Sequence, residues 1–195
     1  VKYPDGCFVE DTAIITDKCA IITRPGDKTR QGEEAKIRDI LSAQMQLEHI
    51  YSPGMVDGGD ILRINNHFYI GLSNRTNQEG ANQLTAILSK YGCSASPMPI
   101  NGILHLKSGV TYIGRNHVVS IDFFCDKFEN FMIIPVDKDE EYSANCLLVN
   151  DFLLMPKGFP KLNRRISKLG YQIIELEMSE FRKMDGGLTC LSLLY

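Results

Sequence analysis

A pattern of strand, turn, strand, helix and strand occurs four times along this 195-residue chain, and it constrains the fold more than any other feature. Short apolar runs predict the strands, and tight connections such as Asn65–His67 and Asn150–Asp151 suit hairpins between the first two strands of a unit. Two of the expected helices end where a glycine follows, at Gly92 and Gly170. The sequence therefore predicts an α/β protein built from ββαβ repeats.

The four units share one order of elements, although the helix of the third is reduced to a short patch. A further strand, Leu188–Leu194, is expected to begin a fifth unit. The elements expected in the four units are Cys7–Ile15, Ala20–Thr23, Glu33–Leu47 and Glu48–Ser52; Asp60–Ile64, Phe68–Leu72, Gln78–Tyr91 and Ser94–Pro97; His105–Ile113, His117–Ile121, Lys127–Phe131 and Met132–Pro135; and Asn145–Asn150, Phe152–Met155, Pro160–Leu169 and Gln172–Glu175.

Polar or reactive residues recur near the start of the first strand of each unit, at Glu10, Asp57, His105, Asn145 and Cys190. The intervals between them are 47, 48, 40 and 45 residues. A closed ring of such units explains this regular spacing and leaves no exposed sheet edge. In such a ring, equivalent positions converge on the central axis.

The incomplete fifth unit leads to an expectation about the two ends of the chain. We expect most of that unit to precede Val1, so that residues 1–195 form a single domain that lacks the N-terminal part of the fifth repeat. Val1 and Tyr195 are then expected to lie beside the same gap in the ring.

The composition excludes several classes of function. The chain has 21 Lys and Arg residues and 24 Asp and Glu residues, so its net charge is −3. Nucleic-acid binding needs a dense positive charge, which this composition does not supply. No apolar run approaches the roughly 20 residues of a membrane span. The six cysteines form no CxxC pair and no cluster with histidine, so we expect neither a disulfide framework nor a metal site. Buried thiols fit a reducing compartment, and we expect a cytoplasmic protein.

The convergence of the repeats gathers a candidate catalytic set. Glu10 and Asp11, Asp57, His105 and Cys190 would meet at one axis from distant parts of the sequence, as catalytic residues commonly do. The alternative is that Cys190 is a buried core cysteine. A thiol ordinarily titrates near 8.5, so a nucleophilic Cys190 needs a cationic neighbour.

His105 is the candidate for that neighbour among four histidines. It is preferred because its position in the repeat matches that of Cys190. We expect His49, His67 and His117 to be surface or structural residues. Asp57 would accept a hydrogen bond from the imidazole and fix its tautomer, which completes a cysteine–histidine–carboxylate set.

Six motifs in register give the chain a resemblance to a known family. The motifs, together with Pro4-Asp5 ahead of the first, are Phe8-Val9-Glu10-Asp11-Thr12-Ala13, Thr23-Arg24-Pro25-Gly26, Asp57-Gly58-Gly59-Asp60, Gly71-Leu72-Ser73-Asn74-Arg75-Thr76-Asn77, His105-Leu106-Lys107-Ser108 and Leu188-Thr189-Cys190. With these motifs the chain resembles the dimethylarginine dimethylaminohydrolase family of the guanidine-modifying, pentein-fold superfamily.

The resemblance implies a fold and a set of roles. The fold is a five-bladed α/β-propeller of ββαβ repeats, and members carry an additional N-terminal stretch. Cys190 would be the nucleophile, His105 the general acid and base, and Asp57 its orienting partner. The substrate's cationic groups would meet carboxylates and its α-carboxylate would meet arginines. The implied substrate-binding residues are Asp5, Glu10, Asp11, Arg30, Arg75 and the backbone at Met184.

The implied reaction is hydrolysis of Nω-methylated arginine, asymmetric dimethylarginine or monomethylarginine, to citrulline and a methylamine through a covalent thiouronium. No metal or organic cofactor is expected, since the substrate already carries an electrophilic cationic carbon. An arginine deiminase or amidinotransferase on the same fold is the alternative enzyme. A truncated propeller without catalytic activity is the alternative from another class. The sequence leaves the oligomeric state open.

Overall fold

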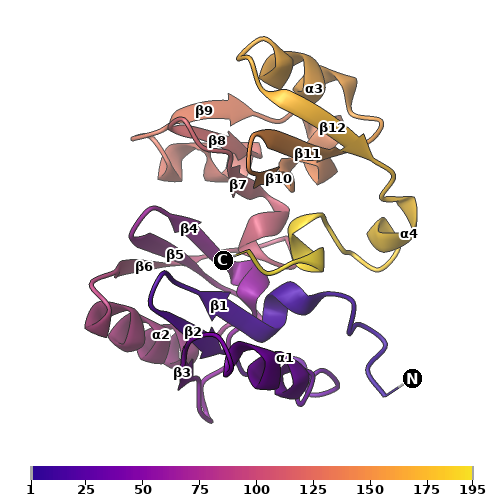
Figure 1. The fold of residues 1–195 in the computed structure, drawn as a ribbon. Helices are drawn as coiled ribbons and strands as arrows, with labels where there is room; N and C mark the ends of the chain where they lie inside the picture. The colour runs from indigo at the N-terminus through magenta and orange to yellow at the C-terminus, as the bar shows by residue number, and fades with distance from the viewer. Residues whose placement is uncertain (1, 195) are drawn as a thin grey trace. The chain divides into compact units, whose positions relative to one another are not determined.

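The computed structural model describes residues 2–194 and contains four three-stranded sheets that follow one another along the chain (Figure 1). In each sheet the first two strands pair antiparallel and the second and third pair parallel. A parallel pair needs a crossover connection, which a helix or a 3-10 segment supplies here. The prediction of repeated ββαβ-like units is therefore confirmed. The prediction about Val1 and Tyr195 falls outside the described residues.

The elements of the four repeats keep the expected order. The bounds are β1 Ala13–Ile15, β2 Cys19–Ile22, α1 Glu34–Leu41 and β3 Gln46–His49; β4 Ile61–Ile64, β5 His67–Leu72, α2 Gln78–Lys90 and β6 Ser94–Pro99; β7 Val110–Tyr112, β8 His117–Ser120, the 3-10 segment η4 Asp122–Lys127 and β9 Met132–Pro135; and β10 Leu147–Val149, β11 Phe152–Pro156, α3 Pro160–Ser167 and β12 Gln172–Leu176, followed by α4 Ser179–Arg182.

Each repeat opens with a 3-10 segment, and this corrects the predicted starts of the first strands. The segments are η1 (Val9–Thr12), η2 (Gly58–Asp60), η3 (Leu106–Ser108) and η5 (Lys138–Ala144). Their backbone groups bond locally instead of joining a ladder: in η2, the amide of Asp60 donates to the carbonyl of Asp57 over 3.1 Å. The polar anchor residues therefore lie in or next to turns ahead of the strands.

Three other predicted elements were wrong in extent or type. The first helix ends at Leu41, whose carbonyl accepts from both Gln44 and Met45 in a tight turn that returns the chain to β3. The helical patch of the third repeat is η4, upstream of the predicted residues 127–131. The expected strand Leu188–Leu194 contains the 3-10 turn η6 (Thr189–Leu191) instead, because the amide of Thr189 bonds to a side chain.

The chain divides into two compact units. The first comprises residues up to Leu106 together with those from Cys190 onward, and the second comprises Lys107–Thr189. The first unit holds the β1–β3 and β4–β6 sheets, and the second holds the β7–β9 and β10–β12 sheets. That residues 1–195 form one propeller domain stays a prediction. No described helix is long and apolar enough to cross a membrane.

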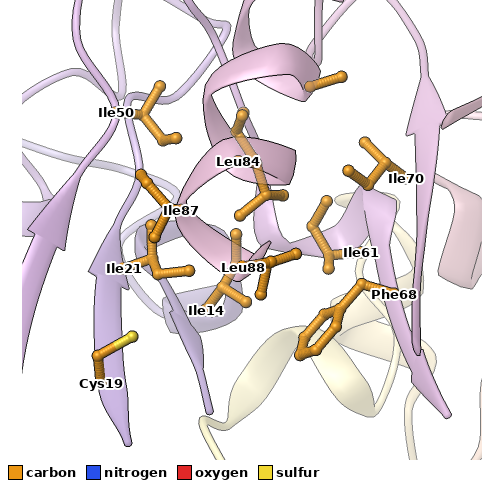
Figure 2. Packing of buried hydrophobic residues seen from close by; sticks show 12 residues of the cluster. Ile14, Cys19, Ile21, Ile50, Ile61, Phe68, Ile70, Leu84, Ile87 and Leu88 are labelled. Carbon is orange, nitrogen blue, oxygen red and sulfur yellow. The ribbon is translucent and has the colours of Figure 1, made fainter. Parts of the chain in front are cut away.

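The core of the first unit joins its two repeats (Figure 2). Helix α2 begins at the N-cap Asn77, whose side chain accepts from the amide of Gly80 over 2.8 Å. Its buried residues Leu84 and Leu88 lie one turn apart on the face that meets both sheets. Each such side chain contributes roughly 1.5–3 kcal/mol through burial. The shared core fixes η1 of the first repeat against η2 of the second. Its members are Ile14, Cys19, Ile21, Ile50, Val56, Ile61, Phe68, Ile70, Ala81, Leu84, Ile87 and Leu88.

In the second unit, a buried carboxylate begins a helix. Glu140 is 4% exposed, and its two oxygens accept from the amides of Lys161 and Leu162 over 3.0 and 2.8 Å. These amides belong to the first turn of α3, where no intrahelical acceptor is available, and Pro160 precedes them at the helix start. Glu140 thus has a purely structural set of contacts.

Candidate active site

Two glycines let the turns η1 and η2 approach closely in the first unit. A Cβ on Gly58 would lie 2.0 Å from the carbonyl oxygen of Glu10, a distance that no side chain tolerates. The amide of Gly59 donates to Oδ1 of Asp11 over 2.8 Å. The paired glycines of the Asp57-Gly58-Gly59-Asp60 motif therefore bring the carboxylate of Asp11 into the second repeat.

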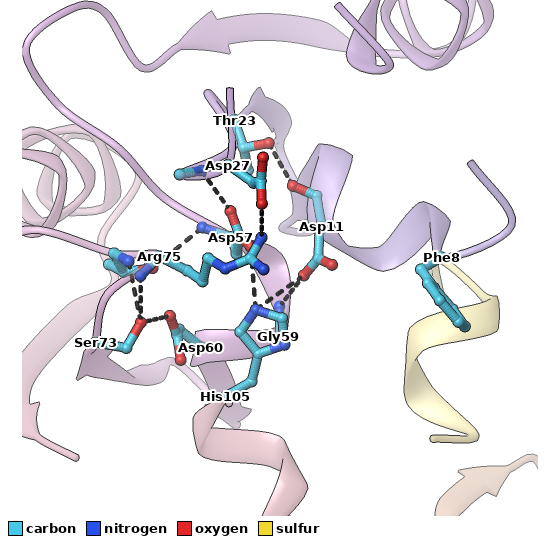
Figure 3. Close-up of polar contacts among 12 residues, drawn as sticks. Phe8, Asp11, Thr23, Asp27, Asp57, Gly59, Asp60, Ser73, Arg75 and His105 are labelled. Carbon is cyan, nitrogen blue, oxygen red and sulfur yellow. Dashed lines mark hydrogen bonds and ion pairs between the residues drawn. The ribbon is translucent and has the colours of Figure 1, made fainter. Parts of the chain in front are cut away.

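His105 lies between the two buried carboxylates that this contact brings together (Figure 3). Its Nε2 is 3.0 Å from Oδ2 of Asp57 and 3.9 Å from Oδ1 of Asp11. Asp57 is fully buried, and His105 and Asp11 are 6% and 2% exposed. Because a carboxylate accepts, the Nε2–H donates to Asp57 and leaves Nδ1 as the ring nitrogen available for proton transfer. The predicted pairing of His105 with Asp57 is present.

Both oxygens of Asp57 are occupied, and they fix its orientation. Oδ1 accepts from the amide of Gly26 over 2.8 Å while Oδ2 accepts from His105. The amide of Asp57 itself donates to Oγ1 of Thr76 over 3.1 Å. A carboxylate held at both oxygens and at its backbone cannot rotate away from the imidazole, so it orients the ring.

Arg30 neutralises Asp11 from the side opposite Gly59. Its Nη1 donates to Oδ2 of Asp11, and its Nε and Nη2 donate to Oε2 of Glu33 over 3.1 and 2.8 Å. Nη2 also donates to the carbonyl of Phe8 over 2.9 Å. Arg30 is 5% exposed, and the two carboxylates raise the pKa of its guanidinium further above its usual range, against the effect of burial. Arg30 is thus bound within the protein.

The charges around His105 favour its protonated form. Burial pushes the pKa of the imidazole down, but the charge of Asp11, the hydrogen bond to Asp57 and the charges of Asp60 and Asp57 outweigh it and raise the pKa to about 9. The Asp11 pKa is lowered: burial opposes its charge, and the charges of His105 and Arg30 prevail. The site therefore holds an imidazolium at neutral pH, as a proton donor and a partner for a thiolate require.

Asp60 is a fully buried carboxylate beside His105 to which sequence reasoning gave no role. Its Oδ1 accepts from the amide of Leu106 over 3.0 Å, and its Oδ2 accepts from the hydroxyl of Ser73 over 2.6 Å. Burial raises the pKa of Asp60 to about 6, although His105 and the hydrogen bonds lower it. The motif Asp57-Gly58-Gly59-Asp60 contains Asp60, but nothing in the motif tells a solvated acid from a buried one.

One described set of side chains has metal-ligand chemistry, and it is this same cluster. Donor atoms of Asp11, Asp57 and His105 lie within 4.8 Å of one another. Each of these side chains already has a hydrogen-bond partner: His105 and Asp57 bond to each other, and Asp11 accepts from Gly59 and Arg30. The cation that these carboxylates surround here is the imidazolium itself.

The remaining predicted residues differ in where the structure places them. Cys190 lies half-buried in η6 and belongs to the first unit, which also holds His105 and Asp57. Glu10 is buried in η1 next to Asp11. Asp5 is partly exposed, and its backbone carbonyl accepts from the guanidinium of Arg30 over 3.5 Å. The side chain of Arg75 is 26% exposed, and its guanidinium lies 3.4 Å from the carboxylate of Asp27. Met184 is 45% exposed and belongs to the second unit.

Comparison with known proteins gives a family. Residues 3–151 match the family model described as arginine deiminase. The chain is 44% identical over its whole length to an N(G),N(G)-dimethylarginine dimethylaminohydrolase of Pseudomonas aeruginosa, of which it covers 78%. A protein of the same name from Streptomyces coelicolor is 34% identical over 97% of the chain and 74% of the relative.

Solved structures agree with these relatives. The P. aeruginosa enzyme, as a cysteine-to-serine mutant complexed with citrulline, matches with a TM-score of 0.97 and 43% identity over 100% of this chain and 78% of that one. The N-terminal domain of the arginine dihydrolase ArgZ matches with a TM-score of 0.88 at 17% identity, a likeness of fold. The predicted pentein fold is thus confirmed. The chain belongs to the arginine deiminase family and, within it, to the dimethylarginine dimethylaminohydrolases.

Proposed function

We propose that this protein hydrolyses Nω-methylated arginine, asymmetric dimethylarginine or monomethylarginine, to citrulline and a methylamine, with Cys190 as nucleophile. The observation that carries the proposal is the buried His105–Asp57 pair, whose charge environment keeps the imidazole protonated. Cys190 belongs to the same compact unit. The 44% identical relative bears the name of this activity and supports the substrate class.

The first half of the reaction forms a covalent intermediate. The thiolate of Cys190 adds to the cationic guanidinium carbon and gives a tetrahedral adduct. Nδ1–H of His105 donates its proton to the methylated nitrogen, and the C–N bond breaks to release a neutral methylamine. The product is an S-alkylthiouronium on Cys190. Asp57 stays ionised and stabilises the imidazolium before the transfer.

The second half returns the enzyme to its starting state. Neutral His105 takes a proton from water as the water oxygen adds to the thiouronium carbon. The C–S bond then breaks, the thiolate leaves, and the carbonyl of citrulline forms as the hydroxyl proton passes to solvent, where the released methylamine takes it up. His105 is again protonated, so the cycle consumes one water and needs no external acid. In this proposal the reaction draws on no metal or organic cofactor.

Substrate binding divides between carboxylates and arginines. We assign Glu10, Asp11 and Asp5 to the cationic groups of the substrate and the backbone at Met184 to its amino-acid end. Arg75 is the better placed of the two arginines for the α-carboxylate. Its single ion pair with Asp27 spans 3.4 Å at a partly exposed site, whereas Arg30 is bound to two buried carboxylates. An exposed ion pair exchanges readily for a ligand.

The test is citrulline release from asymmetric dimethylarginine by the full-length protein, with arginine assayed beside it. Cys190→Ser should lower turnover by more than roughly a thousandfold, because an imidazole does not ionise an alcohol as it does a thiol. Normal turnover by Cys190→Ser would end the covalent mechanism. A preference for unmodified arginine would favour a deiminase, the activity after which the matching family model is named. Absence of turnover on both would favour a non-catalytic protein. We expect the activity in the cytoplasmic fraction.

A further inference from the structure

We propose that Asp60 and Ser73 are positioning residues of this active site: Asp60 holds the backbone beside His105 and places a negative charge near its imidazole, and Ser73 connects Asp60 to the backbone of Arg75 and Thr76. The inference rests on the proposed function, since it concerns the same reaction. It deepens that function by giving a role to Asp60, the buried acid of the Asp57-Gly58-Gly59-Asp60 motif, which takes no part in the reaction steps above.

Asp60 anchors the peptide that follows the catalytic imidazole. Its Oδ1 accepts from the amide of Leu106 over 3.0 Å, one residue beyond His105. Leu106 is itself fully buried, so this amide has no access to water and relies on Asp60 for a partner. A charged acceptor makes such a bond about twice as strong as a neutral one. The carboxylate thereby fixes the backbone from which the imidazole projects.

Ser73 extends this anchor to the residues on the other side of the site. Its hydroxyl donates to Oδ2 of Asp60 over 2.6 Å, and its oxygen accepts from the amides of Arg75 and Thr76 over 2.9 and 3.1 Å. The hydroxyl of Thr76 in turn accepts from the amide of Asp57 over 3.1 Å. One continuous set of hydrogen bonds therefore links the backbones of the general acid, its carboxylate partner and the arginine assigned to the substrate.

Close packing holds this network in one geometry. A Cβ on Gly71, in β5, would lie 2.9 Å from Cβ of Leu106 and 3.2 Å from Oδ1 of Asp60. Strand β5 therefore packs directly against the hydrogen bond between Asp60 and the amide of Leu106. A side chain at Gly71 would displace one of the two partners, so the glycine is what allows β5 to pack this close to them.

Asp60 also acts on His105 through its charge. Among the described residues, the charged groups that act on the imidazole are Asp11 from η1, Asp57 just before η2 and Asp60 from η2, with Arg30 behind Asp11. Asp60 is ionised above pH 6 or so and then favours the imidazolium. Removing that charge while keeping the shape should let the imidazolium lose its proton at a lower pH.

The experiment measures the titration of His105 by NMR in the unliganded full-length protein, together with kcat and KM across pH. Asp60→Asn keeps the size of the side chain and removes the charge. We expect the His105 titration and the basic limb of kcat to fall by about one pH unit, with kcat reduced roughly 10–100-fold and KM little changed. An unmoved titration would overturn the charge role of Asp60.

Ser73→Ala keeps the charge and breaks the link. The His105 titration should stay within a few tenths of a pH unit, while the amides of Arg75 and Thr76 exchange faster and KM rises roughly tenfold. Ser73→Thr retains the hydroxyl and should restore slow exchange and KM. Unchanged exchange and KM in Ser73→Ala would overturn the positioning role of Ser73.

A matched control comes from Glu140, a buried acid of the second unit whose two carboxylate oxygens accept from two backbone amides. Glu140→Gln removes one buried charge in the second unit and should lower stability without moving the His105 titration. If Glu140→Gln shifted the titration as far as Asp60→Asn, a general effect of folding would replace the proposal. Because titration and exchange are read without turnover, they decide the inference even where the enzyme assay shows no methylarginine hydrolysis.

Discussion

Gly59 lies directly against the imidazole of His105: a Cβ on Gly59 would be 2.6 Å from Nδ1 and 2.8 Å from Cγ of the ring. The same residue donates its amide to Asp11 over 2.8 Å. The glycine therefore serves two purposes, since it lets the ring pack against the backbone of η2 and it holds the carboxylate that faces the ring. The side of the ring that it touches carries the nitrogen assigned to proton transfer.

Gly59→Ala should therefore inactivate the enzyme without unfolding it. The added methyl group forces the imidazole away from Asp57 and displaces Nδ1 from its working position, and a displacement of about 1 Å costs on the order of 100-fold in rate. Turnover of dimethylarginine and circular dichroism measure the two effects. Gly92→Ala is the control: Gly92 has a φ of +80° with open space around it, so the substitution should cost stability and leave the rate unchanged. Equal activity of both variants would contradict the packing argument.

Asp57→Asn tests the orienting bond separately from the position of the ring. The amide oxygen can still accept from one of the two partners, Gly26 or His105, but the negative charge beside the imidazole is lost. We expect kcat to fall roughly 10–100-fold, as for other partners that orient a catalytic group, with KM within a few-fold of the wild type. Steady-state kinetics at pH 7 check this. A KM effect with normal kcat would assign Asp57 to substrate binding instead.

The raised pKa of His105 predicts a loss of stability in alkaline solution. The folded-state pKa of about 9 lies above the ordinary histidine pKa of 6.5, so the stabilisation is fully present below pH 6.5 and is lost as pH rises through 9. The amount is on the order of 3 kcal/mol for such a buried group. Urea unfolding at several pH values between 6 and 9.5 measures it. His105→Gln should flatten this part of the curve, and an equally steep fall in that variant would point to other groups.

Much of the fold is predictable from the sequence, because hydrophobic runs and turn residues recur in each repeat. The hairpin of β4 and β5 and the helix α2 begin and end close to the expected residues. What the pattern does not contain is the inward bonding of polar residues ahead of the first strands. The side chain of Asp60 accepts from the amide of Leu106, and the amide of Thr189 donates to the side chain of Asn145. Both contacts lie at 3-10 turns that replace predicted strand residues.

The candidate site shows the same division. The equivalent repeat positions of Asp57 and His105 predict that the two meet, and their side chains are 3.0 Å apart. No spacing rule reveals that Arg30 is bound by Asp11, because that pair depends on how the loop before α1 folds over η1. The role of Arg30 as an α-carboxylate ligand, taken from family resemblance, therefore stays a prediction, and its contacts point to a structural contribution.

Replacement of Arg30 and of Arg75 by alanine should have different effects. The comparison tests which arginine binds the substrate and which one stabilises the fold. Arg75→Ala loses one partly exposed ion pair, so stability should change by less than about 1 kcal/mol while KM for dimethylarginine rises roughly tenfold or more. Arg30→Ala removes the guanidinium that pairs with the buried carboxylates of Asp11 and Glu33, and it should cost about 3–5 kcal/mol of folding free energy.

Urea unfolding and steady-state kinetics on both variants separate the two effects, and Arg38→Ala, which removes an exposed pair with Asp39, is the control for loss of a positive charge. Arg38→Ala should change neither KM nor stability appreciably. If Arg30→Ala folded as stably as the wild type and raised KM instead, its bonds to the buried carboxylates would be exchangeable. Arg30 would then be the α-carboxylate ligand, because only a guanidinium released by Asp11 and Glu33 can form a bidentate pair with a substrate.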